Sequence, residues 1–403
     1  MEYSSRPEQT SQAHAPTGVT TIRPFEIAIA EEALADLHMR LERTRWPDEV
    51  DGAGWEYGTN LAYLRELVGY WRTSFDWRAQ ERALNHFAHY VASIDGLDVH
   101  FIHERGQGPR PLPLVLTHGW PGTFFEMRKL IPLLTNPARF GADPLDAFDV
   151  VVPSLPGYGF SERPRQRDFE RSWIINRWAA LMTDALGYAR FGAHGGDFGS
   201  GVTTGLGLRY PERLVGIHLT ALADPYLGPG APELSPAESA YMRLRERWRD
   251  EEGGYQHQQG TRPQTLGYGL NDSPAGLAAW IVEKYRAWSG CNGDVERSFT
   301  KDELLTTITI YWLTQTINSS IRMYYAARHY PQPATAEDRV TVPTGVALTT
   351  EAVDHAPREW AERLYHLQRW TELPRGGHFL ALEEPELLAE ELRAFFRPLR
   401  QEA

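Results

Sequence analysis

Apolar side chains at helical spacing dominate the N-terminal part of the chain. Residues 27–41 and 61–71 have the three- and four-residue apolar spacing of amphipathic helices, and the run Asp-Gly-Ala-Gly at 51–54 is typical of a turn between them. Residues 1–22 are instead polar, with Ser, Thr, Gln and Pro, and are predicted to be disordered. The pattern therefore predicts a disordered tail followed by a helical arm over 23–88.

A period of two residues follows this arm. Residues 90–94 and 97–103 alternate apolar and polar side chains on either side of Asp95-Gly96. This pattern predicts a β-hairpin, because both central positions of such a turn favour positive φ. The arm and the hairpin together are expected to occupy residues 23–110.

Short apolar runs then alternate with helical segments. The predicted buried strands are residues 112–116, 148–152 and 214–219, and the predicted helices are residues 124–134 and 173–186. Strands that alternate with helices indicate a mostly parallel sheet covered by helices. The predicted fold class is therefore α/β, and the first part of its core is expected to span residues 111–222.

The strand pattern lapses between residues 223 and 338, where the sequence is helical and rich in aromatic residues. Such a stretch between strands predicts an inserted helical lid. The strand signal returns at 344–349 and 369–372, and a final helix is predicted at 386–396. Residues 339–403 are thus expected to complete the α/β core.

Composition and charge exclude several classes of partner. The formal net charge of −12 argues against nucleic acid and against an anionic membrane surface. The sequence has no apolar run of about 18 residues and no secretory leader. Its single cysteine, Cys291, excludes an intramolecular disulfide and fits a reducing compartment. We therefore expect a soluble, cytoplasmic protein.

The most informative motif is His-Gly-Gly-Asp-Phe-Gly-Ser-Gly at 194–201, directly after the apolar residues 191–193. Gly195, Asp197 and Gly199 have the G-x-D-x-G form of a nucleophile elbow. The better-known α/β-hydrolases have G-x-S-x-G, with Ser at the position of Asp197. Glycines are needed because a Cβ would clash in so tight a turn. A carboxylate is a poor nucleophile for acyl transfer, but it attacks saturated carbon well and forms an alkyl ester. The motif therefore predicts a substrate with a strained or activated C–O or C–halogen bond.

Further polar residues follow the later strands, at the edge where ligands bind in open α/β sheets. His378 comes after the last predicted strand, and Glu351 and Asp354 follow the strand at 344–349. The order nucleophile, acid, histidine is that of α/β-hydrolases. His378 is expected to deprotonate the water that hydrolyses the ester, while a carboxylate orients its ring.

Hydrolysis of an ester also needs backbone donors for the oxyanion. In this fold one donor is the residue after the nucleophile, Phe198, and another lies in the loop after an earlier strand, which points to Trp120. His86 and His89 are three residues apart on a predicted helix but lack a third ligand. Since no G-x-G-x-x-G or Walker motif stands out either, we expect neither a metal nor a cofactor.

Taken together, the motifs resemble those of α/β-hydrolase-fold epoxide hydrolases of the microsomal type, specifically the soluble bacterial and fungal members. The resemblance covers nearly everything after residue 23. It rests on Thr-Arg-Trp-Pro at 44–47, His-Gly-Trp-Pro-Gly at 118–122, Pro-Ser-Leu-Pro-Gly-Tyr-Gly-Phe-Ser at 153–161, Gly-Gly-Asp-Phe-Gly-Ser at 195–200, Leu-Asn-Asp-Ser-Pro at 270–274, Tyr-Trp-Leu-Thr at 311–314 and Gly-Gly-His-Phe at 376–379. It implies an α/β-hydrolase fold with an N-terminal arm and hydrolysis of a small-molecule epoxide to a vicinal diol without a cofactor. It also allows a homodimer, since members of the family are often dimers.

The resemblance further implies two lid tyrosines that hydrogen-bond the epoxide oxygen and protonate the opening alkoxide. The Gly-Tyr segment ahead of Asn-Asp-Ser-Pro matches Tyr255. The tyrosine about a dozen residues after Tyr-Trp-x-Thr matches Tyr324, with Tyr325 as the adjacent alternative. A phenol suits this role because its pKa of about 10 keeps it neutral at pH 7.

The sequence departs from this family at the acid. Members usually have Phe-Pro-x-Asp or Phe-Pro-x-Glu, whereas this chain has Thr-Thr-Glu-Ala at 349–352, which places Ala352 at the acid position. Glu351 is one residue early and Asp354 is two residues late. A shift of the loop would let Glu351 reach His378, which we favour, with Asp354 as the second choice.

Two other functions stay open at this stage. A haloalkane dehalogenase shares the Asp nucleophile and the fold, but that family typically has Trp after the nucleophile, where this chain has Phe198. A non-catalytic, ligand-binding relative is supported only by Ala352. The aromatic-rich lid suggests a bulky or aryl epoxide, and the sequence does not choose between a biosynthetic and a detoxifying role.

Overall fold

The computed structural model describes residues 18–166, 169 and 171–402. The predicted disordered tail, 1–22, lies outside the described residues as far as residue 17. Its last residues are corrected by the structure, since β1 (Val19–Phe25) is a strand that pairs antiparallel with β2 (His89–Ile94). Backbone hydrogen bonds to a distant strand hold this segment, so the local sequence pattern did not reveal it.

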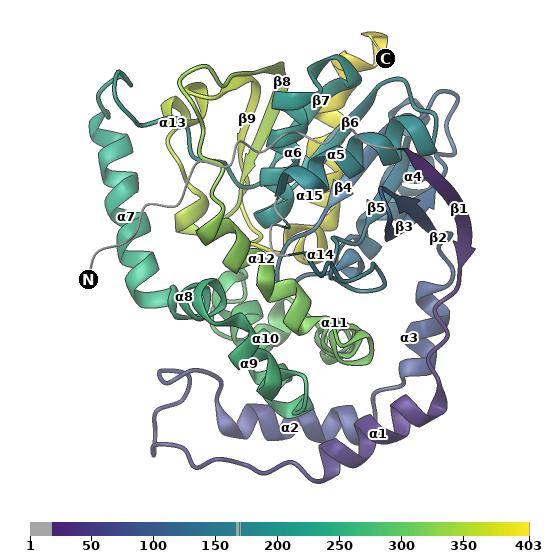
Figure 1. Cartoon of the computed structure of the whole chain (residues 1–403), viewed down its shortest axis with the longest axis vertical. Coiled ribbons are helices and arrows are strands. Elements are labelled where there is room, and N and C mark those ends of the chain that lie inside the picture. Colours follow the sequence, from purple (N-terminus) through teal and green to yellow (C-terminus); the bar gives the residue numbers. More distant parts are fainter. Residues whose placement is uncertain (1–17, 167–168, 170, 403) are drawn as a thin grey trace.

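One mixed sheet of nine strands organises the described part of the chain, in the order β1-β2-β3-β5-β4-β6-β7-β8-β9 (Figure 1). The remaining strands are β3 (Leu97–Glu104), β4 (Leu112–Thr117), β5 (Phe148–Pro153), β6 (Phe191–Gly195), β7 (Leu214–Leu219), β8 (Val340–Leu348) and β9 (Tyr365–Glu372). The six strands β4 to β9 are parallel to one another. Strands β1, β2 and β3 pair antiparallel, and β3 also pairs antiparallel with β5. The turn between β2 and β3 has Asp95 at φ 50° and Gly96 at φ 71°, which confirms the predicted hairpin.

Alternate side chains of the central strands enter two separate hydrophobic cores. One core includes residues of helices α4 (Leu130–Thr135) and α15 (Pro385–Phe396), and the other includes residues of α5 (Arg171–Ala180) and α6 (Asp197–Arg209). Leu114 and Leu116 of β4 belong to the core with α4 and α15, while Val115 between them belongs to the core with α5 and α6. Because successive strand residues point to opposite faces, the sheet is covered on both sides, and the predicted α/β class is confirmed.

Some predicted helices differ in detail. The helix predicted at 124–134 is divided at Lys129 into η1 (Phe124–Arg128) and α4. The helix predicted at 173–186 begins at Arg171 and ends in the π-helical turn η4 (Leu181–Ala185). The other short helices are η2 (Pro137–Phe140), η3 (Pro144–Asp146), η5 (Pro211–Arg213), η6 (Val295–Arg297), η7 (Ala352–Asp354), α13 (Arg358–Glu362), α14 (Leu380–Glu383) and η8 (Arg397–Glu402).

Helices fill the stretch between β7 and β8, where the lid was predicted (Figure 1). They are α7 (Pro236–Glu252), α8 (Gly254–Thr261), α9 (Pro263–Leu270), α10 (Pro274–Trp288), α11 (Lys301–Thr314) and α12 (Ile317–His329). The N-terminal arm, with α1 (Glu31–Glu42), α2 (Leu61–Thr73) and α3 (Trp77–Leu84), runs along the lid, where α1 and α2 contact α10. Lid helix α10 therefore lies between the arm and the sheet, whereas α7 lies to one side, away from the arm (Figure 1).

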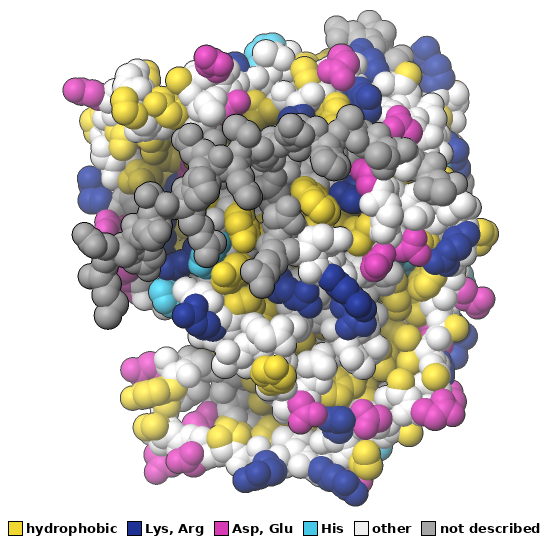
Figure 2. Space-filling view, viewed as in Figure 1, with side chains coloured by type: hydrophobic (Ala, Val, Ile, Leu, Met, Phe, Trp, Pro, Cys, Tyr) yellow, Lys and Arg dark blue, Asp and Glu magenta, His cyan; other side chains and the backbone are white. Residues whose placement is uncertain are grey.

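No helix in the described ranges is both long and apolar enough to cross a bilayer. On the face shown in Figure 2, the acidic and basic side chains of the described residues are interspersed rather than gathered by sign.

Candidate active site

Asp197 stands at the turn from β6 into α6. It is the first residue of α6 and has a left-handed φ of 47°. A Cβ on Gly195 would lie 2.3 Å from the backbone of Gly199, and a Cβ on Gly199 would lie 2.0 Å from the carbonyl oxygen of Thr117. The close approach of these backbones explains why the G-x-D-x-G turn needs glycine on both sides of Asp197.

The two carboxylate oxygens of Asp197 have different neighbours. The backbone N–H of Trp120 donates to Oδ1 at 2.9 Å, while Oδ2 lies 3.6 Å from Nε2 of His378. A Cβ on Gly119 would lie 2.3 Å from both Cβ and Oδ1 of Asp197, so only glycine admits the carboxylate here. The structure thus brings together Asp197, His378 and the backbone of Trp120. Phe198 follows in the first turn of α6, where backbone N–H groups lack intrahelical acceptors.

The loop that carries His378 is held from two sides. The backbone N–H of His378 donates to the carbonyl oxygen of Trp288 at the end of α10, at 2.8 Å. The N–H groups of Gly377 and Phe379 both donate to the carboxylate of Glu383, which also accepts the N–H of Gly290 at 2.8 Å. Sequence reasoning missed Glu383, since a Glu-Glu-Pro run signals only the start of a helix.

His378 is electrostatically coupled to its acidic neighbours. Burial by itself lowers the pKa of His378, but its acidic neighbours, led by the charges of Asp197 and Asp354, raise it by more, so that the pKa lies above its ordinary value. The charge of Asp197 is the largest of these contributions, followed by that of Asp354. The imidazolium form of His378 is therefore favoured while Asp197 is ionised.

The acid segment folds as a short turn after β8. Neither Glu351 nor Asp354 makes a hydrogen bond or an ion pair with His378 within the described part of the chain. The hydroxyl of Thr349 donates to Oδ2 of Asp354 at 3.3 Å. Burial raises the pKa of Glu351 to about 7 and also raises the pKa of Asp354. Because the charge of Asp354 acts on His378 more strongly than that of Glu351, the electrostatics favour Asp354, the second choice from the sequence.

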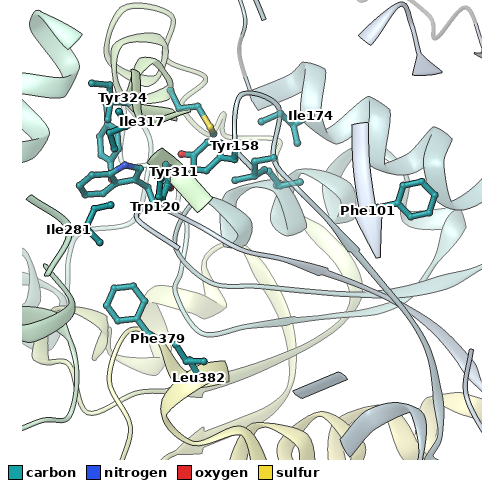
Figure 3. Close-up of a cluster of buried hydrophobic side chains, with 14 of the residues drawn as sticks. Phe101, Trp120, Tyr158, Ile174, Ile281, Tyr311, Ile317, Tyr324, Phe379 and Leu382 are labelled. Carbon is teal, nitrogen blue, oxygen red and sulfur yellow. The ribbon is translucent and has the colours of Figure 1, made fainter. Parts of the chain in front are cut away.

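Tyr255 of α8 and Tyr324 of α12 meet at the ring of Trp120. Trp120 stacks on Tyr255 at a centroid distance of 5.5 Å and contacts Tyr324 edge to face at 5.6 Å, and the two tyrosine rings lie 5.7 Å apart. Figure 3 shows Trp120 next to Tyr324. The ring centroids of Phe198 and Tyr324 are 4.9 Å apart, so the two tyrosines lie beside the elbow that carries Asp197. Tyr325 instead stacks on His329, outside this cluster.

Both phenols are held neutral by their surroundings. Burial raises the pKa of Tyr255 and of Tyr324 above the ordinary value, and the negative charge of Asp197 adds to the effect in both. Tyr324 Oη is buried without a hydrogen bond of normal geometry among the described residues, although Tyr255 is close enough to influence its proton. Two neutral O–H groups are therefore available near the carboxylate of Asp197.

A small cavity of about 20 Å³ lies beside Asp197 and His378. Its lining also includes Glu126 of η1, and none of its lining residues belongs to the lid. Sequence reasoning missed Glu126, although it follows the His-Gly-Trp-Pro-Gly motif by four residues. About 10–15 Å³ is enough for one water molecule, so the cavity has room for a small polar species on the core side of Asp197.

In the described residues, no three His, Cys, Asp or Glu side chains are placed to hold a metal ion together. His86 and His89 do not share a helix as predicted, because His89 begins β2. Nδ1 of His89 pairs with Nε2 of His100 at 2.9 Å, and its Nε2 pairs with the carbonyl oxygen of Leu84. Strand pairing has therefore placed His89 in a buried polar contact.

Comparisons with known sequences identify relatives of this chain. The family described as "Epoxide hydrolase N terminus" matches residues 22–127, and the family described as "alpha/beta hydrolase fold" matches residues 113–250. A protein of Stigmatella aurantiaca (strain DW4/3-1) is 45% identical over 94% of this chain and 86% of its own length. Epoxide hydrolase 1 of Sus scrofa is 39% identical over 95% of this chain and 90% of its own length.

Solved structures share the same architecture over almost the whole chain. The Aspergillus niger epoxide hydrolase superposes with a TM-score of 0.81 at 30% identity, covering 96% of this chain and 99% of that chain. The juvenile hormone epoxide hydrolase of the silkworm Bombyx mori gives a TM-score of 0.80 at 29% identity, with 95% of each chain covered. The lid and the N-terminal arm are therefore included in both matches.

Proposed function

The chain belongs to the epoxide hydrolases of the α/β-hydrolase fold, and from this premise we propose that it opens an oxirane to a vicinal diol through an ester on Asp197. The observation that carries the proposal is the pair of contacts at this carboxylate, with Oδ1 bound by the N–H of Trp120 and Oδ2 facing His378. One oxygen is held by a backbone donor, and the other stands next to a base. A carboxylate placed in this way suits attack on carbon followed by hydrolysis.

In the first half-reaction, Oδ2 of Asp197 attacks an oxirane carbon while the C–O bond breaks. The released alkoxide takes a proton from Tyr255 or Tyr324, whose hydroxyls are buried near Asp197. Their raised pKa keeps these phenols protonated until the alkoxide, a much stronger base, is formed. The product of this step is an alkyl ester of Asp197 with one free hydroxyl on the substrate.

In the second half-reaction, His378 takes a proton from water, and the water oxygen attacks the ester carbon. The oxyanion develops on Oδ1, where the N–H of Trp120 already donates and the N–H of Phe198 is the second candidate donor. His378 then returns its proton to the diol oxygen as the bond to the ester carbon breaks. The remaining proton on Asp197 restores the phenol, so no other reactant is required.

We assign the orientation of His378 to Asp354, with Glu351 as the alternative favoured by sequence. Two observations support Asp354: its charge raises the pKa of His378 more strongly, and a hydrogen bond from Thr349 fixes its carboxylate. The backbone N–H and hydroxyl of Thr350 both donate to the carbonyl oxygen of Gly376, which ties this segment to the histidine loop. A bulky or aryl epoxide fits the aromatic walls formed by Trp120, Tyr255 and their neighbours.

Racemic styrene oxide is the probe that tests this function. The wild type is expected to release the vicinal diol, and D197A is expected to release none. In a single turnover with excess enzyme in ¹⁸O-water, the label should enter Asp197 and be absent from the diol, because the diol oxygen comes from the carboxylate. Label in the first-turnover diol would contradict the ester and indicate direct attack of water on the epoxide.

A further inference from the structure

Glu126 shares the small cavity with Asp197 and His378 but has no part in the steps above. It lies in η1, directly behind the loop that contains Gly119 and Trp120. A Cβ on Gly122 would lie 2.3 Å from Oε2 of Glu126, so the carboxyl group occupies the space that any larger residue at position 122 would fill. The hydroxyl of Tyr311 donates to the carbonyl oxygen of Gly122 at 2.9 Å and fixes this backbone.

Two of the other polar side chains that line the cavity are engaged elsewhere. His118 uses Nδ1 on the carbonyl oxygen of Gly119 and Nε2 on the N–H of Leu155. The hydroxyl of Thr117 accepts from the indole of Trp178 at 3.0 Å. Within the described residues, the carboxyl group of Glu126 makes no hydrogen bond or ion pair. Besides Asp197 and His378, Glu126 is thus a polar group that can hydrogen-bond to a molecule in the cavity.

The cavity is also on the correct side for water. Its lining comes entirely from the core of the fold, whereas Tyr255 and Tyr324 belong to the lid. An epoxide whose oxygen faces these phenols would approach Asp197 from the lid side. Water entering the core-side cavity would reach the carbonyl carbon of the ester without crossing the bound alkyl group.

We propose that Glu126 positions the hydrolytic water: its carbonyl oxygen accepts one O–H, and Nε2 of His378 takes the other. With both hydrogens directed away, a lone pair of the water oxygen faces the ester carbon of Asp197. That oxygen bonds to the carbon, its proton passes to His378, and the bond to the diol oxygen breaks. Glu126 neither gains nor loses a proton.

The charge state of Glu126 fits this role. Burial raises its pKa to about 8, with Asp197 and Glu383 adding to the shift and His378 opposing it. Near neutral pH the group is therefore mainly the uncharged acid, which accepts through its carbonyl oxygen. A neutral acid also avoids a further negative charge beside the Asp197 carboxylate.

The test follows the ester by intact-protein mass after rapid mixing with styrene oxide, and it rests on the proposed function. In E126A, formation of the adduct should stay within about threefold of wild type, while its decay slows by about 100-fold because the water is no longer oriented. In E126Q, the amide carbonyl can accept the same O–H, so decay should recover to within about tenfold of wild type. The ester would accumulate on Asp197 in E126A alone.

The matched control is E303Q, which removes the ion pairs of the buried Glu303 with Arg128, the last residue of η1, and with Lys129, while Glu303 does not line the cavity. It should lower the unfolding midpoint but leave the ratio of adduct formation to decay unchanged. Wild-type decay in E126A, or equal slowing of both steps in E126A and E126Q, would overturn the role of Glu126. Diol formation by the wild type without any adduct would instead refute the ester mechanism itself.

Discussion

The carboxylate of Glu383 accepts hydrogen bonds from the backbone N–H groups on both sides of His378, at 3.1 Å from Gly377 and 3.1 Å from Phe379. It accepts a third from Gly290, just after the lid helix α10. One half-buried side chain thus links the histidine loop to the end of a lid helix. The position of the loop that carries His378 therefore depends on this carboxylate.

Replacing Glu383 by Ala should lower the free energy of unfolding by about 2 kcal/mol or more, because three N–H groups lose their acceptor. It should also slow hydrolysis of the ester by about tenfold to 100-fold as His378 shifts. Chemical denaturation and adduct decay measure the two effects. The neighbouring control E384Q removes only an exposed ion pair with Arg375 and should cost less than about 1 kcal/mol. Equal losses in both variants would argue against the positioning role.

Asp354 and Glu351 can be distinguished by their amide variants. D354N should slow decay of the ester by about a thousandfold or more, because His378 loses its orientation and its countercharge, while the ester still forms. E351Q should change decay by less than about threefold, since its charge acts more weakly on His378. Rapid-quench mass measurements of both variants decide the matter. The opposite ranking would return the role to Glu351.

The pKa of His378 should fall when Asp197 becomes an ester. In the free enzyme this pKa lies above 6.5, and the charge of Asp197 is the largest contribution that raises it. Esterification removes that charge, so the imidazole becomes neutral at lower pH and can accept a proton from water. Because the imidazolium cannot act as base, decay of the ester should slow as pH falls through this lowered pKa. NMR titration of His378 in the free enzyme should give a midpoint above that of the decay profile, and coincident midpoints would contradict the coupling.

The lid phenols should act only before the ester exists. Y255F and Y324F should each slow adduct formation by about 100-fold, because the alkoxide loses a proton donor, and should leave adduct decay unchanged. Stopped-flow formation rates with styrene oxide measure the loss. Y325F serves as the matched control, since Tyr325 stacks on His329 away from the cluster, and it should keep wild-type rates. Slower decay in Y255F or Y324F would place these tyrosines in the second half-reaction as well.

Gly119 should tolerate no side chain. The Cβ of G119A would lie 2.3 Å from Asp197 Cβ, so the carboxylate must move and adduct formation should fall by about 100-fold or more. G69A in helix α2 meets no atom within 4 Å and is expected to keep full activity and to gain up to about 1 kcal/mol of stability. Comparison of kcat/KM and unfolding midpoints separates the two positions. Normal activity of G119A would show that Asp197 is not confined as the structure indicates.

Elements with a local signature were predictable. The β2–β3 turn requires positive φ at two adjacent residues, and Asp95-Gly96 supplies them. The elbow requires close backbone approach, and the glycines around Asp197 supply it. The central parallel strands β4, β5 and β7 are short apolar runs, because they are buried on both faces. Strand β1 has no such signature, since its place depends on hydrogen bonds to β2.

The sequence by itself determined the fold class, the elbow that carries Asp197 and the family to which the chain belongs, because these depend on residue types at short, regular spacings. Only the tertiary structure decided which distant side chains meet there. Glu126 and Glu383 reach the site across loops that no periodicity describes, and the ranking of Asp354 above Glu351 depends on how a turn after β8 faces His378. Electrostatic coupling and hydrogen bonding depend on ångström-scale separation in space, which the packing of the whole chain sets.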